Sequence, residues 1–439
     1  MESCQSVSPC SQYVNIAFQE LRPTLYYATI TIPQWCVSTM YKVASSAQKK
    51  QSSAHGFYRG NVPIEYIEQH FTSILHDHLK ELLFNYFVIH FLYEQLQERK
   101  IPIAGEPRLI DIKLEHDKDA RFIFELTVFP DLDLNEWKYF LFKAPKRKKY
   151  KDLDRQVETF CKEEKELAKK YADAGIDIGD WVCLELALVD ENSEHYFKDH
   201  TIPLWLKIGD EEADRILLSC FKGKKVGDTF ISTSKGLQDY FSTQLEMLYP
   251  FKVTISDMVS NHTFDFELLK KHFKIKTNKD MNKKLIEVFS YRNNLSQRRA
   301  MAEDALQLML MKHKFDVPNH LVLRQEKIVL DAVQNNPDYY VYRMQKDFKY
   351  YIKRLAEKQS KEMILLDHIA FNDNVVVTRD DVKSYLNLSN RPRMKEFIYF
   401  DMPASKVNGR EMPLSEFMLK QVCLREKTIN HIIHQLTKR

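Results

Sequence analysis

The residues best suited to touch another molecule lie in one short loop, GFYRGNVP, at positions 56–63. Gly56 and Gly60 bracket Phe57, Tyr58 and Arg59, so the backbone can turn tightly at both ends while three large side chains point outward. The chemistry of such a tip is recognition of a partner, not catalysis. An ordinary turn between two helices would have the same composition, and from these residues alone both interpretations stay open.

The segments on either side must hold this loop in place. Residues 25–32, LYYATITI, have the aromatic and β-branched content of a strand, which Pro33 ends, and a polar helix is expected between that strand and the loop. Beyond the loop, we expect a helix that begins with Asn61 as its N-cap. Apolar residues then recur at three- and four-residue spacing from 64 to 86, which predicts one long amphipathic helix.

The overall composition limits the classes of function. A chain of 439 residues is long enough for two to four domains, and its formal charge of +4 is small, so any contact with nucleic acid should be local. The seven cysteines form no CxxC pair and have no nearby histidine spacing. We interpret them as reduced thiols of a cytoplasmic protein and predict neither a metal site nor a cofactor.

No segment predicts secretion or a membrane anchor. Residues 1–12 lack the basic and apolar regions of a signal peptide. The most apolar run, residues 82–93, is interrupted by Asn85 and His90 and is shorter than the roughly 20 residues that a spanning helix needs. We expect a buried helix there.

Glycine is the most informative count. The chain has only 10 glycines; six of them lie between Gly175 and Gly236, and none occurs from residue 237 to residue 408. Because glycine marks turns, this contrast predicts a β-rich middle domain attached to a largely helical body.

Two motifs carry a resemblance to a known family. The loop at 56–63 resembles the Gly-Phe-Arg-x-Gly-x-x-Pro signature of trigger factor, the bacterial ribosome-associated chaperone, although Tyr58 stands where the family has arginine and Arg59 follows one place later. The helix-breaking segment 101–107, IPIAGEP, resembles the Pro-Ala-Gly turn at the end of the family's docking domain. Two strands are expected after it, at 108–115 and 121–129.

The middle segment resembles the FKBP-type peptidyl-prolyl isomerase domain that trigger factor carries. The matching pieces are GDWVCLEL at 179–186, LKIGD at 206–210 and FKGKKVGDTF at 221–230. Such an isomerase needs no acid or base, because a dry aromatic pocket that favours the twisted amide lowers the barrier to X-Pro rotation of about 18–20 kcal/mol.

The aromatic pattern of that pocket is poorly kept. Asp190–Ser193 replaces the family's Phe-x-Gly, and Arg215–Cys220 replaces its Ile-Pro-Gly-Phe-Glu. Four aromatic residues are candidates for a catalytic pocket, although positions in the β core are the explanation that their pattern favours: Tyr196, Phe197, Trp205 and Phe221. We therefore predict weak or absent isomerase activity.

The rest of the chain is expected to be helical. A basic linker at 143–151 precedes a charged helix at 152–171, and the chain is expected to be helical from Phe251 onward. One C-terminal helix is expected to begin at Phe264, and three more are expected at 282–315, 339–366 and 423–436. The turn at 316–321, DVPNHL, resembles the family's Asp-Val-Pro motif. Eleven of the fourteen methionines lie beyond residue 250 and suit a surface that meets many apolar shapes.

These observations predict an α+β multidomain protein. The expected parts are an α/β ribosome-docking domain (1–120), a linker or body strand segment (121–149), a small degenerate FKBP-like β-rich domain (150–250) and an elongated, mainly helical client-binding domain (251–439). The helical body is expected to include residues 122–142.

The resemblance implies a chaperone. It would dock near the ribosomal exit, on protein and rRNA, through Gly56–Gly60 and hold unfolded nascent chains to assist their folding and export, with no membrane partner and a possible homodimer away from the ribosome. A ribosome-independent holdase or assembly chaperone without isomerase activity is the alternative that the altered tip leaves open.

Overall fold

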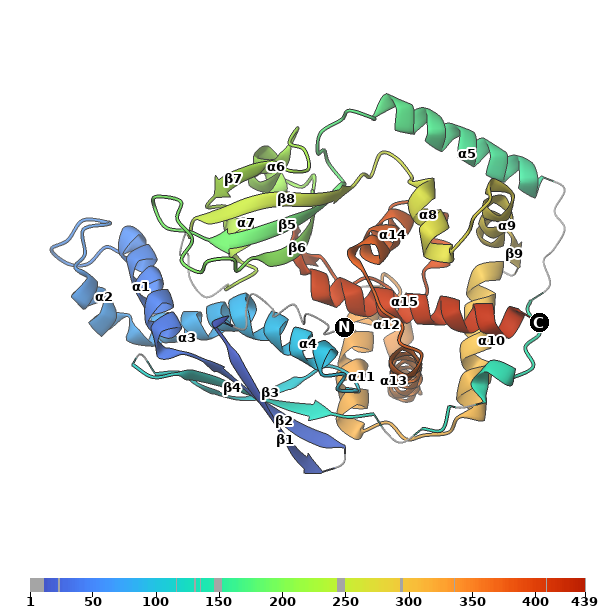
Figure 1. Cartoon of the computed structure of the whole chain (residues 1–439), viewed down its shortest axis with the longest axis horizontal. Helices are drawn as coiled ribbons and strands as arrows, with labels where there is room; N and C mark the ends of the chain where they lie inside the picture. The colour runs from blue at the N-terminus through green and yellow to red at the C-terminus, as the bar shows by residue number, and fades with distance from the viewer. Residues whose placement is uncertain are drawn as a thin grey trace, which may run out of the picture.

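The structure is a computed structural model. It describes residues 12–22, 24–115, 117–129, 132–134, 136–145, 152–242, 249–292, 295–334, 336–407 and 409–438. Three parts are visible: an N-terminal sheet with helices on one side, a second sheet beside those helices, and a helical body (Figure 1). Most of the basic linker predicted at 143–151 lies outside the described residues.

The N-terminal sheet is antiparallel, with the order β1-β2-β4-β3. Its strands are β1 (Asn15–Arg22), β2 (Leu25–Ile32), β3 (Arg108–Lys113) and β4 (Ala120–Thr127). Alternate residues of β2 and β4 are buried, as a sheet with one covered face requires. The predicted strand at 25–32 is confirmed, and so are the two strands after residue 107.

Strand β4 corrects one expectation. It pairs with β2 along its whole length and with β3, so residues 122–127 belong to the N-terminal sheet and not to the helical body. Phe124 stacks on Phe84 of the covering helices, with ring centroids 6.1 Å apart. β4 also crosses the domain boundary expected at residue 120, because the hydrophobic pattern of a strand does not reveal which sheet it joins.

Helices cover one face of this sheet (Figure 1). They are α1 (Gln34–Gln51), α2 (Ile64–His70), α3 (Thr72–Leu83) and α4 (Ile89–Glu98). The single helix predicted over 64–86 is wrong at Phe71, where φ is −113° and the chain bends between α2 and α3. A π-helical turn at Phe84–Val88 then joins α3 to α4.

The second sheet is also antiparallel, with the order β13-β6-β5-β8-β7. Its strands are β5 (Trp181–Leu188), β6 (Ile202–Lys207), β7 (Thr229–Ser232), β8 (Phe251–Val259) and β13 (Leu414–Ser415), with α6 (Arg215–Phe221) and α7 (Lys235–Gln238) beside them. Strand β8 shows that the expectation of a helical chain from Phe251 is wrong for 251–259. β13 comes from the far C-terminal segment and pairs with β6 through Leu414 and Trp205.

The central strand β5 is buried on both faces, since WVCLELAL has only one position that is not buried. One face packs into a core shared with the N-terminal helices, and the other packs against the helical body through Trp181 and Cys183. A strand covered on both sides reads as a continuous apolar run, which is what this sequence shows.

The helical body surrounds α15 (Figure 1). The helices are α5 (Leu153–Lys170), α8 (Phe266–Phe273), α9 (Asn278–Phe289), α10 (Gln297–Lys312), α11 (Asn319–Gln334), α12 (Tyr339–Arg343), α13 (Phe348–Asn372), α14 (Arg379–Ser389) and α15 (Glu416–Thr437). Short paired strands are β9 (Tyr291–Arg292), β10 (Leu295–Ser296), β11 (Lys406–Val407) and β12 (Arg410–Glu411). The α+β multidomain fold class is confirmed.

Two expected helices of the body differ from the structure. The segment 282–315 contains two helices, α9 and α10, separated by the β9–β10 pair. The segment 339–366 is interrupted between Arg343 and Phe348. Uninterrupted apolar periodicity misled the prediction in both cases, because neither break contains glycine or proline.

Candidate functional site

The loop predicted as a contact tip is exposed and anchored at both ends. Gly56 and Gly60 have φ of +88° and +86°, the left-handed region in which glycine is favoured. The backbone N–H of Phe57 donates to the carbonyl of Ala54 (2.9 Å), and that of Gly60 donates to the carbonyl of Ser52 (3.2 Å). The loop therefore has a defined shape, and its outermost side chains are held out by backbone hydrogen bonds.

All three predicted tip side chains are exposed. Tyr58 is 86% exposed and Phe57 is 41% exposed, and Arg59 is exposed as well. Phe57 also lies against Tyr66 of α2, with ring centroids 6.3 Å apart. One aromatic ring thus braces the loop while Tyr58 and Arg59 remain available to a partner.

The prediction of Asn61 as an N-cap is wrong. Helix α2 begins at Ile64, the residue before it is Pro63, and no side chain caps its first N–H groups. The extended backbone of Pro63, with φ of −58° and ψ of 145°, sets the direction in which the chain enters the helix. Asn61 instead closes the tip, because its backbone N–H donates to the carbonyl of Tyr58 (3.0 Å).

A second exposed surface lies on α11, α12 and α13, which we call the arm. α11 and α13 pack against each other around a small core that includes Val322, Val329, Ile352 and Ala356. Large apolar side chains of the arm that remain exposed are Leu323, Ile328, Tyr340, Val341, Tyr342, Met344, Tyr350, Tyr351 and Leu355. Exposed apolar residues concentrated on one region of the molecule mark an interaction surface.

The four aromatic candidates for an isomerase pocket do not meet in one cavity. Phe197 is buried against Phe87 of the N-terminal part, with centroids 4.9 Å apart, and Phe221 is buried beside Phe230. Trp205 lies in the other core, towards the helical body. Tyr196 is half exposed.

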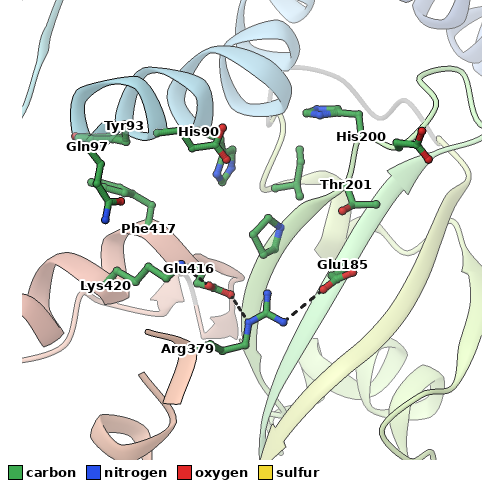
Figure 2. A pocket seen from close by; sticks show the side chains of 14 residues that line it. His90, Tyr93, Gln97, Glu185, His200, Thr201, Arg379, Glu416, Phe417 and Lys420 are labelled. Atoms are coloured by element: carbon green, nitrogen blue, oxygen red, sulfur yellow. Dashed lines mark hydrogen bonds and ion pairs between the residues drawn. The ribbon is translucent and has the colours of Figure 1, made fainter. Parts of the chain in front are cut away.

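A cavity of about 280 Å³ lies where the three parts of the molecule meet (Figure 2). Its walls come from α4, from β5, β6 and the segment before β6, and from Arg379 and the start of α15. Arg379 Nε donates to Glu416 (3.0 Å) and its Nη1 donates to Glu185 (3.4 Å), while Lys420 pairs with the other oxygen of Glu416 (2.8 Å). None of the four aromatic candidates lines this cavity.

The charged groups of the cavity are largely paired with one another, which indicates a structural joint. Above them, Tyr93 of α4 stacks on Phe417 of α15 with ring centroids 3.4 Å apart. This contact joins the N-terminal part to the body directly. Within the described residues, no group of His, Cys, Asp and Glu side chains could hold a metal ion.

Buried histidines line the contact between the N-terminal helices and the second sheet. Burial lowers the pKa of His78, His90 and His200 to about 4 in each case. His78 hydrogen-bonds Ser242 (Nδ1 to Oγ, 3.0 Å) and the hydroxyl of Tyr249.

The other two histidines differ in their partners. His200 Nε2 donates to the carbonyl of Tyr86 (2.9 Å), whereas His90 Nε2 has no hydrogen-bond partner among the described residues and its ring points into the cavity (Figure 2). Neither His78 nor His200 was predicted from the sequence as a site residue, and His90 was recognised only as an interruption of an apolar run. A histidine inside an apolar helical run, such as His90, is the signal that was available.

The five cysteines that the structure describes are unpaired: Cys36, Cys161, Cys183, Cys220 and Cys423. Burial raises the pKa of the Cys36 and Cys183 thiols to about 12. Protonated, buried thiols are poor nucleophiles, so these two residues serve packing. Among the described helices, none has the length and apolar character needed to cross a bilayer.

The N-terminal part of the chain matches a known protein family. Residues 14–160 match the family model described as bacterial trigger factor protein. This range contains the N-terminal sheet, its helices and the whole contact tip.

Curated trigger factors are similar to the chain over most of its length. The trigger factor of Geobacter sulfurreducens is 21% identical over 414 residues, covering 87% of this chain and 91% of the relative. That of Rickettsia canadensis is 21% identical over 412 residues, covering 89% and 86%. That of Mannheimia succiniciproducens is 29% identical over 107 residues, 24% of each chain. The resemblance to trigger factor predicted from the sequence is confirmed.

The solved structures that match include one from work titled "Promiscuous Substrate Recognition in Folding and Assembly Activities of the Trigger Factor Chaperone". It covers 96% of this chain and 100% of the solved chain, with 12% identity and a TM-score of 0.36. At that score the whole-chain superposition carries no conclusion about how the parts are arranged.

Proposed function

We propose that this protein is a trigger factor-like chaperone that docks on the ribosome and holds unfolded nascent chains. The observation that carries the proposal is the tip at Gly56–Gly60, where two glycines with positive φ present exposed Phe57, Tyr58 and Arg59 inside the segment that matches the trigger factor family model. A rigid, mixed aromatic and cationic tip suits a surface made of both protein and rRNA.

Docking through this tip would place the rest of the molecule near emerging chains. The arm supplies exposed apolar side chains from α11, α12 and α13, and these suit weak, broad binding of unfolded segments. Weak binding at each site allows release, which a folding assistant requires. We propose that the protein binds nascent chains in the cytoplasm. Homodimer formation away from the ribosome is a further part of the proposal.

Proline isomerisation is proposed to be weak or absent. The candidates Phe197, Trp205 and Phe221 are buried in two different cores, and Tyr196 is exposed. A kcat/KM on a proline test peptide as high as that of active FKBP-type enzymes would contradict this.

A ribosome-independent holdase is the second candidate. It is favoured by Tyr58, which stands in place of the arginine of the family signature and removes one positive charge from the tip. Both candidates use the same arm, and they differ in whether the tip binds.

Co-sedimentation with bacterial ribosomes at low and moderate salt tests the proposal. The wild type should pellet with ribosomes, and a Phe57→Ala/Tyr58→Ala/Arg59→Ala variant should not. A matched control is Trp35→Ala/Tyr139→Ala/Lys118→Ala, which removes two exposed aromatic rings and one exposed cation elsewhere. If neither wild type nor control pellets, the free holdase replaces the docking chaperone.

A further inference from the structure

We infer that the outer end of the arm, residues 338–355, selects unfolded polypeptide segments in which apolar residues are flanked by acidic ones. This inference rests on the proposed function, because it names the class of client that the arm would hold. Two independent features of the arm end carry it, the exposure of its aromatic and aliphatic side chains and the pattern of its charges.

The arm end exposes large apolar side chains that no part of the described chain covers. Tyr340 is 75% exposed, Val341 66% and Met344 86%, and on the first turns of α13 Tyr350 and Tyr351 are 59% and 57% exposed. Side chains of this size lose contact with water only when a partner covers them. Tyrosine and methionine adapt to partners of different shape, so the surface suits unfolded segments better than one folded protein.

The charges around these side chains are mainly positive. Residues 338–355 contain five cations and two anions, which gives a formal charge of +3, against +4 for the whole chain. The cations are Arg343, Lys346, Lys349, Lys353 and Arg354, and the anions are Asp338 and Asp347. The positive charge of this one short segment is thus nearly as large as the net charge of the whole chain.

None of these cations forms an ion pair within the described residues. Arg343, Lys346, Lys349 and Lys353 form no ion pair there, and all four are exposed. Arg354 lies over the ring of Tyr350 at 5.7 Å, a cation–π contact. The nearby carboxylate of Glu357 already pairs with Lys361 (2.7 Å). Exposed, unpaired cations next to apolar side chains favour a partner that brings carboxylates beside its own apolar residues.

Single-stranded RNA could also use tyrosines and cations, through base stacking and phosphate contacts. The aliphatic members of the surface decide between the two partners. Val341, Met344 and Leu355 are exposed and offer nothing to a sugar-phosphate chain, whereas the leucine, valine and phenylalanine side chains of an unfolded polypeptide would cover them. We therefore assign the surface to acidic polypeptide segments.

The test measures binding of fluorescent unstructured peptides to the full-length protein by anisotropy. The two probes share one apolar core of leucine and phenylalanine and differ only in flanks of glutamate or lysine; oligo(U) RNA is the third probe. A charge-reversal variant carries Arg343→Glu, Lys346→Glu and Lys349→Glu. Its control reverses Lys162, Lys165 and Lys169, three exposed cations of α5 at the opposite edge of the molecule from α11 and α13 (Figure 1).

We expect the wild type and the α5 control to bind the acidic peptide about tenfold more tightly than the basic one at low salt, with the preference shrinking as salt screens it. Charge reversal at the arm end should invert the preference. A Tyr340→Ser/Tyr350→Ser/Tyr351→Ser variant should bind both peptides more weakly than the wild type does but keep the wild-type preference between them. Circular dichroism confirms that each variant is folded.

Three outcomes would overturn the inference. Equal binding of both peptides by the wild type would show that the surface does not select clients by charge. An equal effect of the α5 control would show that the selecting cations do not lie at the arm end. Tighter binding of oligo(U) than of the acidic peptide, lost in the tyrosine variant, reassigns the surface to nucleic acid. If ribosome pelleting and suppression of client aggregation persist in any of these cases, the proposed function stands and only the client class fails.

Discussion

Acidification should weaken the contact between the N-terminal helices and the second sheet. His78 on α3 and His200 before β6 lie at this contact with exposed fractions of 2% and 4%, and burial lowers the pKa of each from 6.5 to about 4. A histidine whose pKa is lower in the folded chain binds protons more readily when unfolded. Its contribution to stability is therefore complete above pH 6.5 and is lost as the pH falls towards 4.

The size of the effect follows from those two pKa values. At pH 5.0 an unfolded histidine of pKa 6.5 is almost fully protonated, whereas one held at pKa 4 is about one-tenth protonated. The difference in proton binding between pH 7.5 and pH 5.0 corresponds to a loss of about 2 kcal/mol for each histidine. This is a large share of the about 5–15 kcal/mol that holds a typical domain folded.

The variant His200→Gln isolates one of these contributions. Its amide can still donate to the carbonyl of Tyr86, as His200 Nε2 does, but it does not titrate. Urea unfolding followed by tryptophan fluorescence at pH 7.5 and pH 5.0 gives the loss of stability for each protein. The variant should lose about 2 kcal/mol less than the wild type, while His55→Gln, at an exposed loop position, should match the wild type.

Equal losses for the wild type and His200→Gln would refute this reasoning. That result would mean that the ring of His200 already takes up a proton in the folded protein, which its burial between Tyr86 and Phe87 should prevent. Comparing differences between proteins removes the contributions of the titrating groups that do not interact with His200, because these are shared.

Three further predictions concern single residues. Arg391→Ala should destabilise the helical body by about 3–5 kcal/mol, because it leaves the buried carboxylate of Glu164, 5% exposed, without its partner. In the wild type the guanidinium of Arg391 donates two hydrogen bonds to that carboxylate, at 2.7 and 3.0 Å. Thermal unfolding measures the loss, and an unchanged Tm would contradict it. Gly179→Ala should cost at least about 1–2 kcal/mol in urea, because φ is +87° and a Cβ would lie 2.4 Å from the side-chain nitrogen of Asn261. Burial raises the pKa of Glu426 to about 7, so ionisation of this carboxyl lowers the free energy of unfolding as the pH rises from 4.5 through 7. Between pH 5 and pH 8, the Glu426→Gln variant should lose about 2 kcal/mol less of its unfolding free energy than the wild type. An unchanged pH profile would show that the carboxyl is solvated.

Local signals predicted the elements and the tip well. The β-branched run at 25–32 and the glycines at 56 and 60 act through neighbouring residues, so strand β2 and the shape of the loop could be derived without knowing the fold. Breaks without glycine or proline, such as the bend at Phe71, were missed because tertiary packing sets them. Phe197 shows the same limit at the site, because its aromatic character suited a pocket as well as the core that in fact contains it.

The exposed surface of the arm and the ion pairs of the cavity could not be predicted from the sequence, for a related reason. The spacing of Tyr340, Tyr350 and Tyr351 gives no indication of which side of the arm other helices leave uncovered. The pairing of Arg379 with Glu185 and Glu416 joins residues that are far apart in the chain. Contacts of this kind depend on topology, which single-sequence patterns do not contain.

Strand β13 has a consequence for how the protein itself is made. Leu414 and Ser415 pair with Trp205 and Leu204 of β6, so the edge of the second sheet is completed by residues synthesised some 210 positions later. Until then β6 presents unpaired backbone groups, the kind of edge at which chains join incorrectly. A protein proposed to hold growing chains therefore has an unpaired sheet edge of its own for about half of its synthesis, from residue 207 to residue 414.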